Sequence, residues 1–185
     1  SRIDIDRIGE TDYIGELGVI NGKLLEDSVK SLEFIESMSM FFNPELFDKT
    51  DEFLNIYFKR TSDGSIKMTE TKYNAKETLK DKKDSAWWWK PVETGLPFWT
   101  DPFEWDGSKI ITYAIPMKDM RNRIIGVMCV NVPLSLIRKN IQDKRIFDTG
   151  YIYIVDSSFV MVHHPDEKVL GQKLDALVPE LAPVK

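Results

Sequence analysis

The sequence predicts an α+β domain in which helices cover an antiparallel sheet. Strand-like runs at residues 110–115 and 124–132 are separated only by the polar segment 118–123. Such a short link favours an antiparallel hairpin over a crossover helix. Apolar residues between 12 and 42 instead recur every three or four positions, as on one face of a helix. Together these patterns predict a long helix beside a hairpin-linked sheet.

A second, shorter helix is expected directly after the long helix. Asn43 and Pro44 predict the N-cap and the first position of a second, shorter helix. Asp63-Gly64 between the β-prone runs 56–60 and 65–69 is a strong hairpin signal. The polar, lysine-rich stretch and the tryptophan-rich segment that follow are expected to be largely irregular, with one small helix.

The C-terminal part predicts one more helix and one more hairpin. Residues 134–146 have apolar positions at helical spacing, and residues 150–155 are predicted to form a strand. The polar residues 156–158 then turn the chain into a partner strand at 159–162.

Composition restricts the class of protein. Of the 185 residues, 42% are hydrophobic and 30% are charged, which is typical of a globular domain with its own core. The net charge is −5 and the basic residues are not clustered, which disfavours nucleic acid as a partner. These residues contain neither an apolar run long enough to span a membrane nor a secretory leader.

The single cysteine, Cys129, lies in the apolar run 124–130. It has no partner in the sequence for a disulfide, and its surroundings predict a small buried hydrophobic residue and not a reactive thiol.

All five tryptophans lie between residues 87 and 105. Clustered aromatic rings offer a large contact area at a low cost in side-chain entropy, so the cluster is typical of a pocket wall. The same rings would equally fill a loop-rich core, and the sequence leaves both interpretations open.

Six short motifs, in the same order, resemble the double Cache family of extracytoplasmic domains in bacterial transmembrane receptors. They are carried by Trp87-Trp88 with Pro91 and Thr94-Gly95, Trp99-Thr100-Asp101-Pro102-Phe103, Ile111-Thr112-Tyr113 with Pro116, Gly126-Val127 with Asn131 and Leu134, Gly150-Tyr151 with Asp156, and His164-Pro165-Asp166 with Gly171.

The resemblance implies a Cache fold with a PAS-like antiparallel sheet. Residues 1–43 would form the long N-terminal helix, residues 44–146 the membrane-distal PAS-like module, and residues 147–185 the incomplete start of a membrane-proximal module. The second module would be incomplete because the sequence stops early or because the module is reduced.

The implied function is sensing of a small molecule outside the cytoplasm, in the periplasm or the extracellular space. The parent would be a membrane-anchored histidine kinase, chemoreceptor, cyclic-dinucleotide enzyme or phosphatase, with a transmembrane segment before Ser1. The domain itself would bind a ligand without enzymatic activity, cofactor or metal. Its long helix would be a candidate surface for homodimerisation.

The ligand is expected to differ from that of the amino-acid-binding branch of the family. In that branch an Arg holds the ligand carboxylate, and a Tyr-x-Asp pair and a later Asp receive the amine. The matching positions here are Ser85, Phe103, Trp105 and Asn131. Because a guanidinium that grips a carboxylate has no uncharged equivalent, a standard amino acid bound in the usual way is disfavoured.

The resemblance implies one cavity against the sheet of residues 110–115 and 124–132. Its lining would be largely aromatic, with one neutral hydrogen-bonding side chain, and such walls suit a flat ring or a soft cation. The expected ligand-binding residues are Trp87, Trp88, Phe103, Trp105, Tyr113, Asn131, Ser85 and Asp101.

Three alternatives remain beside this interpretation. The module would bind nothing and serve as a structural or dimerisation spacer. Asp101, Glu104 and Asp106 beside tryptophans would belong to a carbohydrate-active enzyme, the least favoured alternative. His163 and His164 would bind a metal, but adjacent side chains on a strand point to opposite faces, so no metal site is expected.

Overall fold

The computed structural model describes residues 7, 11–46, 52–68, 73–141, 144–146 and 150–177. The chain folds into two compact units. Unit 1 comprises Ser1–Thr100 and Ile111–Val132, and unit 2 comprises Asp101–Ile110 and Pro133–Lys185. Helices cover an antiparallel sheet, which confirms the predicted α+β class.

The main sheet has seven strands in the order β3-β2-β1-β7-β6-β4, and β5 pairs with β6 off this path. The pairing of β2 with β3 confirms the hairpin predicted around Asp63-Gly64. The strands are β1 (Ser37–Phe42), β2 (Asn55–Arg60), β3 (Ile66–Met68), β4 (Phe98–Trp99), β5 (Phe103–Trp105), β6 (Ser108–Lys118) and β7 (Ile124–Pro133).

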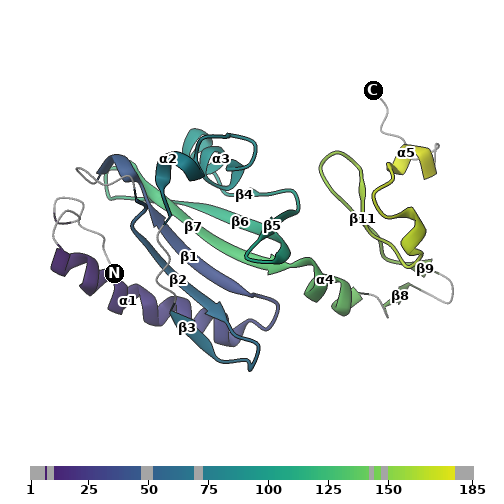
Figure 1. Ribbon diagram of the computed structural model, residues 1–185, viewed down its shortest axis with the longest axis horizontal. Coiled ribbons are helices and arrows are strands. Elements are labelled where there is room, and N and C mark those ends of the chain that lie inside the picture. The colour runs from purple at the N-terminus through teal and green to yellow at the C-terminus, as the bar shows by residue number, and fades with distance from the viewer. Residues whose placement is uncertain are drawn as a thin grey trace. The chain divides into compact units, whose positions relative to one another are not determined.

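Helices lie on both faces of this sheet (Figure 1). The helix α1 runs along one face, where Leu25 and Val29 join a buried core with Met40 of β1. The helix α3 covers the other face, where Trp87 packs on Phe41. The helices are α1 (Thr11–Ser31), η2 (Pro44–Leu46), α2 (Ala75–Thr78), α3 (Ala86–Thr94), α4 (Leu134–Ile141), η3 (Glu167–Val169) and α5 (Leu174–Leu177).

The helix predicted over residues 12–42 is wrong at its C-terminal end. The helix α1 ends at Ser31, and Ser37–Phe42 form the central strand β1 instead. All six residues of β1 are buried, because helices cover both faces of this strand. Ile35, Met38 and Phe42 continue the helical spacing by coincidence, and so short an apolar run fits both periods.

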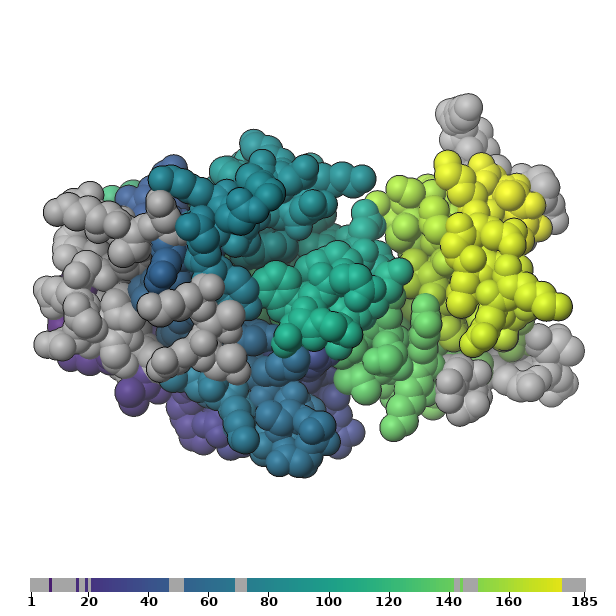
Figure 2. All heavy atoms as spheres, in the orientation of Figure 1, coloured from purple at the N-terminus to yellow at the C-terminus, as the bar shows by residue number. Residues whose placement is uncertain are grey.

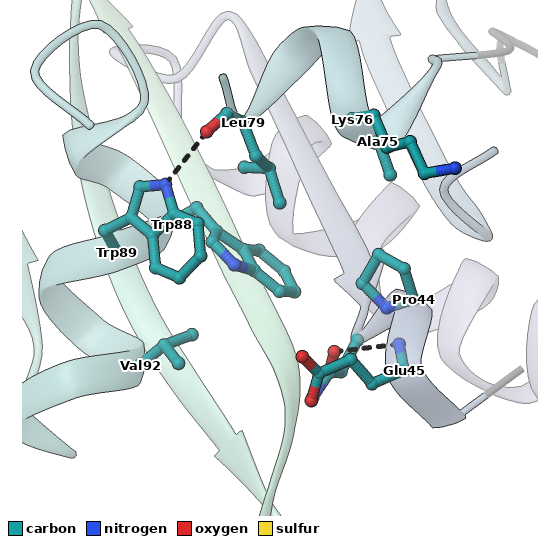
Figure 3. Close-up of a pocket in the computed structure, with 9 residues that line it drawn as sticks. Pro44, Glu45, Ala75, Lys76, Leu79, Trp88, Trp89 and Val92 are labelled. Atoms are coloured by element: carbon teal, nitrogen blue, oxygen red, sulfur yellow. Dashed lines mark hydrogen bonds between the residues drawn. The ribbon is translucent and has the colours of Figure 1, made fainter. Parts of the chain in front are cut away.

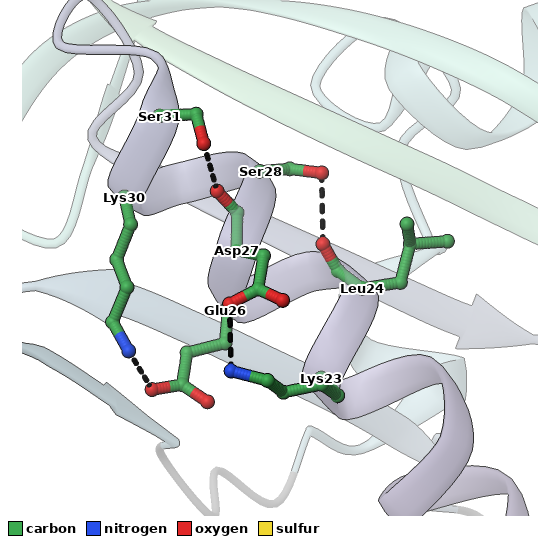
Figure 4. Close-up of polar contacts among 7 residues, drawn as sticks. All are labelled: Lys23, Leu24, Glu26, Asp27, Ser28, Lys30 and Ser31. Atoms are coloured by element: carbon green, nitrogen blue, oxygen red, sulfur yellow. Dashed lines mark hydrogen bonds and ion pairs between the residues drawn. The ribbon is translucent and has the colours of Figure 1, made fainter.

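Polar contacts along α1 stabilise its last turns (Figure 4). Lys23 pairs with Asp27 at 2.7 Å and Lys30 pairs with Glu26, each one helical turn apart. The hydroxyl of Ser28 donates to the Leu24 carbonyl oxygen at 2.8 Å. Because the ion pairs are exposed, each stabilises the helix by only about 0.3–0.5 kcal/mol.

The tryptophan-rich segment is more regular than predicted. Trp87, Trp88 and Trp89 lie on the nine-residue helix α3, which contains Pro91 in its interior. A proline inside a helix usually interrupts the helix, because it lacks the N–H group that would donate to the carbonyl oxygen four residues earlier. The helix instead continues to Thr94, and Gly95 closes it in the left-handed region at φ 67° by donating to the Pro91 carbonyl oxygen.

The segment between β1 and β2 is described only in part. The turn η2 begins at Pro44 as predicted, and Asn43 Oδ1 accepts from the Glu45 N–H group at 3.1 Å. The rest of the predicted short helix lies outside the described residues.

Two elements of unit 2, a helix and a strand, differ from those that the sequence predicted. The helix α4 ends at Ile141, because Arg145–Ile146 form β8 and pair with β9 (Gly150–Tyr151). The strand predicted at 150–155 is split, because β10 (Ile154–Val155) pairs with β11 (Met161–His163) and not with β8. The pairing of β10 with β11 confirms the hairpin predicted around residues 156–158.

Candidate functional site

Two tryptophans pack α3 against the rest of unit 1. The Trp87 ring lies 4.8 Å from the Phe41 ring, and the Trp88 ring lies 5.1 Å from the Phe53 ring. The two indoles meet edge to face at 6.0 Å, and both are almost fully buried. Each aromatic pair contributes about 0.5–1.5 kcal/mol beyond its buried area, so α3 is anchored by its own aromatic side chains.

A buried polar cluster lies on the same face of the sheet as Phe41. Asn131 Nδ2 donates to Ser37 Oγ at 2.9 Å, and Thr112 Oγ1 donates to Asn131 Oδ1 at 2.7 Å. Ser37 is paired with Asn131 across the ladder, so their side chains lie on the same face of the sheet. Ser37 and Phe41 are four residues apart on β1 and also share a face, because strand side chains alternate. The side chains of Ser37, Thr112 and Asn131 therefore point towards α3. We call Ser37, Thr112 and Asn131 the polar cluster. Trp87 and Asn131 therefore share one face of the sheet.

The thiol of Cys129 lies beside this cluster on β7. Burial raises the pKa of the Cys129 thiol far above its usual range, although a hydrogen bond with Ser39 acts in the opposite direction. The thiol therefore stays protonated at physiological pH, which agrees with the prediction of a small buried residue.

Tyr113 does not join the polar cluster. Its neighbour Thr112 points to Asn131, and successive side chains of a strand alternate, so Tyr113 faces the opposite side of the sheet. There its ring lies 4.7 Å from that of Trp99, which is paired with it across the ladder. The prediction that Tyr113 shares a cavity with Asn131 is wrong, because sequence motifs do not fix the face of a strand.

Ser85 is at the entry of α3 and is almost fully buried. Its hydroxyl donates to the Asp81 carbonyl oxygen, so it holds the turn before the helix. A serine in this place satisfies the backbone locally.

The other three expected residues belong to unit 2. Phe103 and Trp105 lie on β5 with their rings edge to face at 6.4 Å. Asp101 is exposed and accepts two hydrogen bonds from Ser157, one from the backbone N–H group at 3.0 Å and one from the hydroxyl at 2.8 Å. Within unit 2, Asp101 thus ties the segment before β5 to the turn between β10 and β11.

A cavity of about 450 Å³ lies between α2, α3 and the turn η2 with the preceding Asn43 (Figure 3). Of the eight expected ligand-binding residues, only Trp88 lines it. We call it the α3 pocket. Its lining residues are Asn43, Pro44, Glu45, Ala75, Lys76, Leu79, Trp88, Trp89 and Val92.

Sequence reasoning missed the α3 pocket, because its walls come from three segments that the chain brings together only on folding. The one available signal was the third tryptophan, Trp89. Its indole Nε1 donates to the Leu79 carbonyl oxygen at 3.3 Å, which joins α3 to the end of α2. The atoms of α2 and α3 reach the outer surface of unit 1 (Figure 2).

Two further features concern metals and membranes. Among the described residues, no group of three or more His, Cys, Asp or Glu side chains is placed to hold a metal ion. In the part of the chain that the structure describes, none of the helices has the length and hydropathy needed to cross a bilayer.

Known structures share this fold. The extracellular domain of the putative histidine kinase mmHK1S-Z3 has a TM-score of 0.62 at 20% identity, over 84% of this chain and 59% of that one. The periplasmic sensory domain of the Campylobacter jejuni chemoreceptor Tlp1 has a TM-score of 0.58 at 15% identity, over 95% of this chain and 65% of that one. The chain thus spans less than two thirds of either domain.

A third similar structure is the ligand-binding domain of the Pseudomonas aeruginosa PAO1 amino acid chemoreceptor PctC in complex with GABA. Its TM-score is 0.52 at 16% identity, over 92% of this chain and 70% of that one. No curated protein sequence matches the chain. The family described as Cache domain matches residues 4–182. Since this match covers almost all of the sequence and the fold agrees with it, the chain belongs to the double Cache family.

Proposed function

We propose that this chain is the extracytoplasmic sensing domain of a bacterial membrane receptor, and that unit 1 binds a small molecule between α3 and the sheet. The observation that supports this proposal is the polar cluster beneath the aromatic side chains of α3. Polar groups buried among apolar walls are what a ligand pocket uses to orient its ligand. Burying polar side chains costs free energy, and apolar residues would fill the same core space without that cost. Packing alone therefore does not explain the three polar side chains of the cluster.

The proposed ligand is not a standard amino acid bound through the usual motif. The polar cluster is uncharged, and Ser85, which stands at the position of the carboxylate-binding arginine, is buried in the entry of α3. A zwitterion entering such a site would lose the hydration of two charges without gaining partners for them. An aromatic or otherwise weakly charged ligand avoids this cost.

Trp87, Trp88 and Asn131 of unit 1 are proposed to contribute to this site. For Phe103, Trp105 and Asp101, which belong to unit 2, a role in binding stays a prediction from the sequence. Tyr113 would act only indirectly, through its stacking on Trp99. The domain is proposed to catalyse nothing and to need no cofactor. Binding would change its contacts with the rest of a membrane-anchored receptor, and a gene without an upstream hydrophobic segment would contradict this arrangement.

Thermal denaturation with a ligand panel tests the binding site. We expect individual L-amino acids at millimolar concentration to leave the melting temperature unchanged, and an aromatic or weakly charged compound to raise it, since a ligand that binds only the folded state stabilises it. Thr112→Val removes one hydroxyl of the polar cluster and should abolish that rise. Thr94→Val removes an exposed hydroxyl that bonds Lys90 and should retain it. A tight calorimetric complex with a simple amino acid would overturn the ligand class.

We also propose that α1 forms a homodimer contact. Val19 and Leu24 on this helix are 76% and 61% exposed, so α1 presents apolar side chains that a partner helix could cover. The double variant Val19→Glu, Leu24→Glu should lower the dimer fraction in sedimentation equilibrium. Met120→Glu, at an equally exposed apolar residue in the turn between β6 and β7, should not. A wild-type chain that stays monomeric at high concentration would contradict the proposal.

A further inference from the structure

We propose that the α3 pocket is a second binding site, for an apolar ligand that carries one positive charge. It shares no residue with the polar cluster, because its walls come from α2 with Leu79, α3, and η2 with Asn43. Its volume of about 450 Å³ is within the range of small-molecule sites. This inference does not depend on the function proposed above.

Protein contacts hold the aromatic walls of the α3 pocket in place. Trp88 is fixed by edge-to-face contacts with Phe53 and Trp87. Trp89 is fixed by the hydrogen bond from its indole nitrogen to Leu79. A ligand would therefore meet walls that need little further ordering, and this lowers the entropic cost of binding.

The charges around the α3 pocket favour a cation. The Glu45 carboxylate extends towards the space beside Val92, whereas the Lys76 ammonium extends away from it (Figure 3). The hydrogen bond between the Glu45 N–H group and Asn43 fixes the backbone that carries this carboxylate. Of the two charged side chains that line the pocket, Glu45 and Lys76, only the Glu45 carboxylate is directed towards the space beside Val92.

The tryptophan rings add to this preference. A ring face attracts a cation through its quadrupole, and tryptophan does so most strongly. One ammonium already lies near the Trp89 ring, because Lys82 Nζ is 4.7 Å from its centroid, and Glu93 pairs with this ammonium at 2.6 Å. A ligand carboxylate beside Glu45 would be repelled by the Glu45 charge, so anionic ligands should bind more weakly than cationic ones.

The test compares two probes of equal size, phenethylamine and 3-phenylpropionate, by titration calorimetry on the full chain. We expect saturable binding of the amine and much weaker binding of the carboxylate. Glu45→Gln should weaken binding of the amine about two- to fivefold, as expected for one exposed charge pair. Glu77→Gln, which removes a nearby carboxylate that pairs with Lys80 outside the pocket, should have no effect.

Two further variants separate this site from the polar cluster. Val92→Arg places a long cationic side chain in the pocket and should abolish binding of phenethylamine, whereas Thr112→Val should leave it unchanged. The reverse pattern would overturn this inference and favour the polar cluster as the binding site. The two proposals fail independently: even if the polar cluster bound no ligand, we would still expect phenethylamine to bind in the α3 pocket.

A spectroscopic measurement avoids variants that fail to fold. Phenethylamine should shift the indole N–H resonances of Trp88 and Trp89 in the NMR spectrum of the unmodified chain, and leave that of Trp105 in place. No saturable binding of phenethylamine, equal affinity for 3-phenylpropionate, or unshifted Trp88 and Trp89 resonances would each overturn the proposal.

Discussion

Asn131 illustrates how a single side chain links the sheet to the candidate site. Its amide bonds Ser37 on β1 through the nitrogen and Thr112 on β6 through the oxygen. It therefore joins three neighbouring strands on the face beneath α3. Its neutral amide offers both a donor and an acceptor, which the aspartate of the amino-acid-binding branch does not.

We expect Asn131→Leu to destabilise the protein by about 1–3 kcal/mol, because it leaves the Ser37 and Thr112 hydroxyls buried without this partner. Urea denaturation measures the change. Asn140→Leu is the matched control, since that amide is exposed and donates to the Leu136 carbonyl oxygen in its own helix. The control should change the free energy of unfolding by less than about 0.5 kcal/mol. Equal stability of Asn131→Leu and wild type would show that the cluster contributes nothing.

Among the elements, β1 and β7 approach each other more closely than side chains normally allow. A Cβ atom at Gly126 would lie 2.2 Å from the Phe41 carbonyl oxygen and 2.7 Å from the Met117 methyl group. Gly126 is therefore required by the close backbone approach at the centre of the sheet, and not by an unusual φ angle.

We expect Gly126→Ala to destabilise the protein by about 1–3 kcal/mol or more, because strand backbone must move to accept the methyl group. Thermal unfolding followed by circular dichroism measures this loss. Gly64→Asn is the control, because nothing lies within 4 Å of its added Cβ and asparagine tolerates the positive φ of 82°. The control should lose less stability. If Gly126→Ala and Gly64→Asn had the same melting temperature, close packing at Gly126 would not be the cause of the loss of stability.

At the scale of the whole molecule, unit 2 contains a group that couples stability to pH. His163 on β11 is buried, and burial, the charge of Arg138 and then that of His164 lower the pKa of its imidazole. Its pKa in the folded state is thus below the value of 6.5 expected for the unfolded chain. The unfolded state binds the proton more readily, so stability should fall as the pH decreases through about 6.5.

We expect wild type to lose more stability than His163→Gln between neutral pH and pH values below this range. Comparing urea midpoints of the two proteins at each pH isolates the histidine. The comparison is needed because carboxylates such as Asp119 also make stability fall in acid. Burial raises the pKa of Asp119, but its hydrogen bonds with Arg123 and Arg121 outweigh burial and lower the pKa. Identical pH dependence in both proteins would exclude His163 as the coupled group.

The sequence by itself determined the class of the fold and the family. The alternation in β6 and β7, the Asp63-Gly64 turn and the motifs between residues 87 and 171 are local patterns, and each identifies its own element.

Only the tertiary structure decided what depends on partners distant in sequence. Residues 37–42 form a strand because β2 and β7 pair with them on either side, which outweighs helical spacing in so short a run. Tyr113 faces away from Asn131 because of the pleat of β6. The α3 pocket exists because segments near residues 44, 76 and 90 meet on folding, and no local pattern records that meeting.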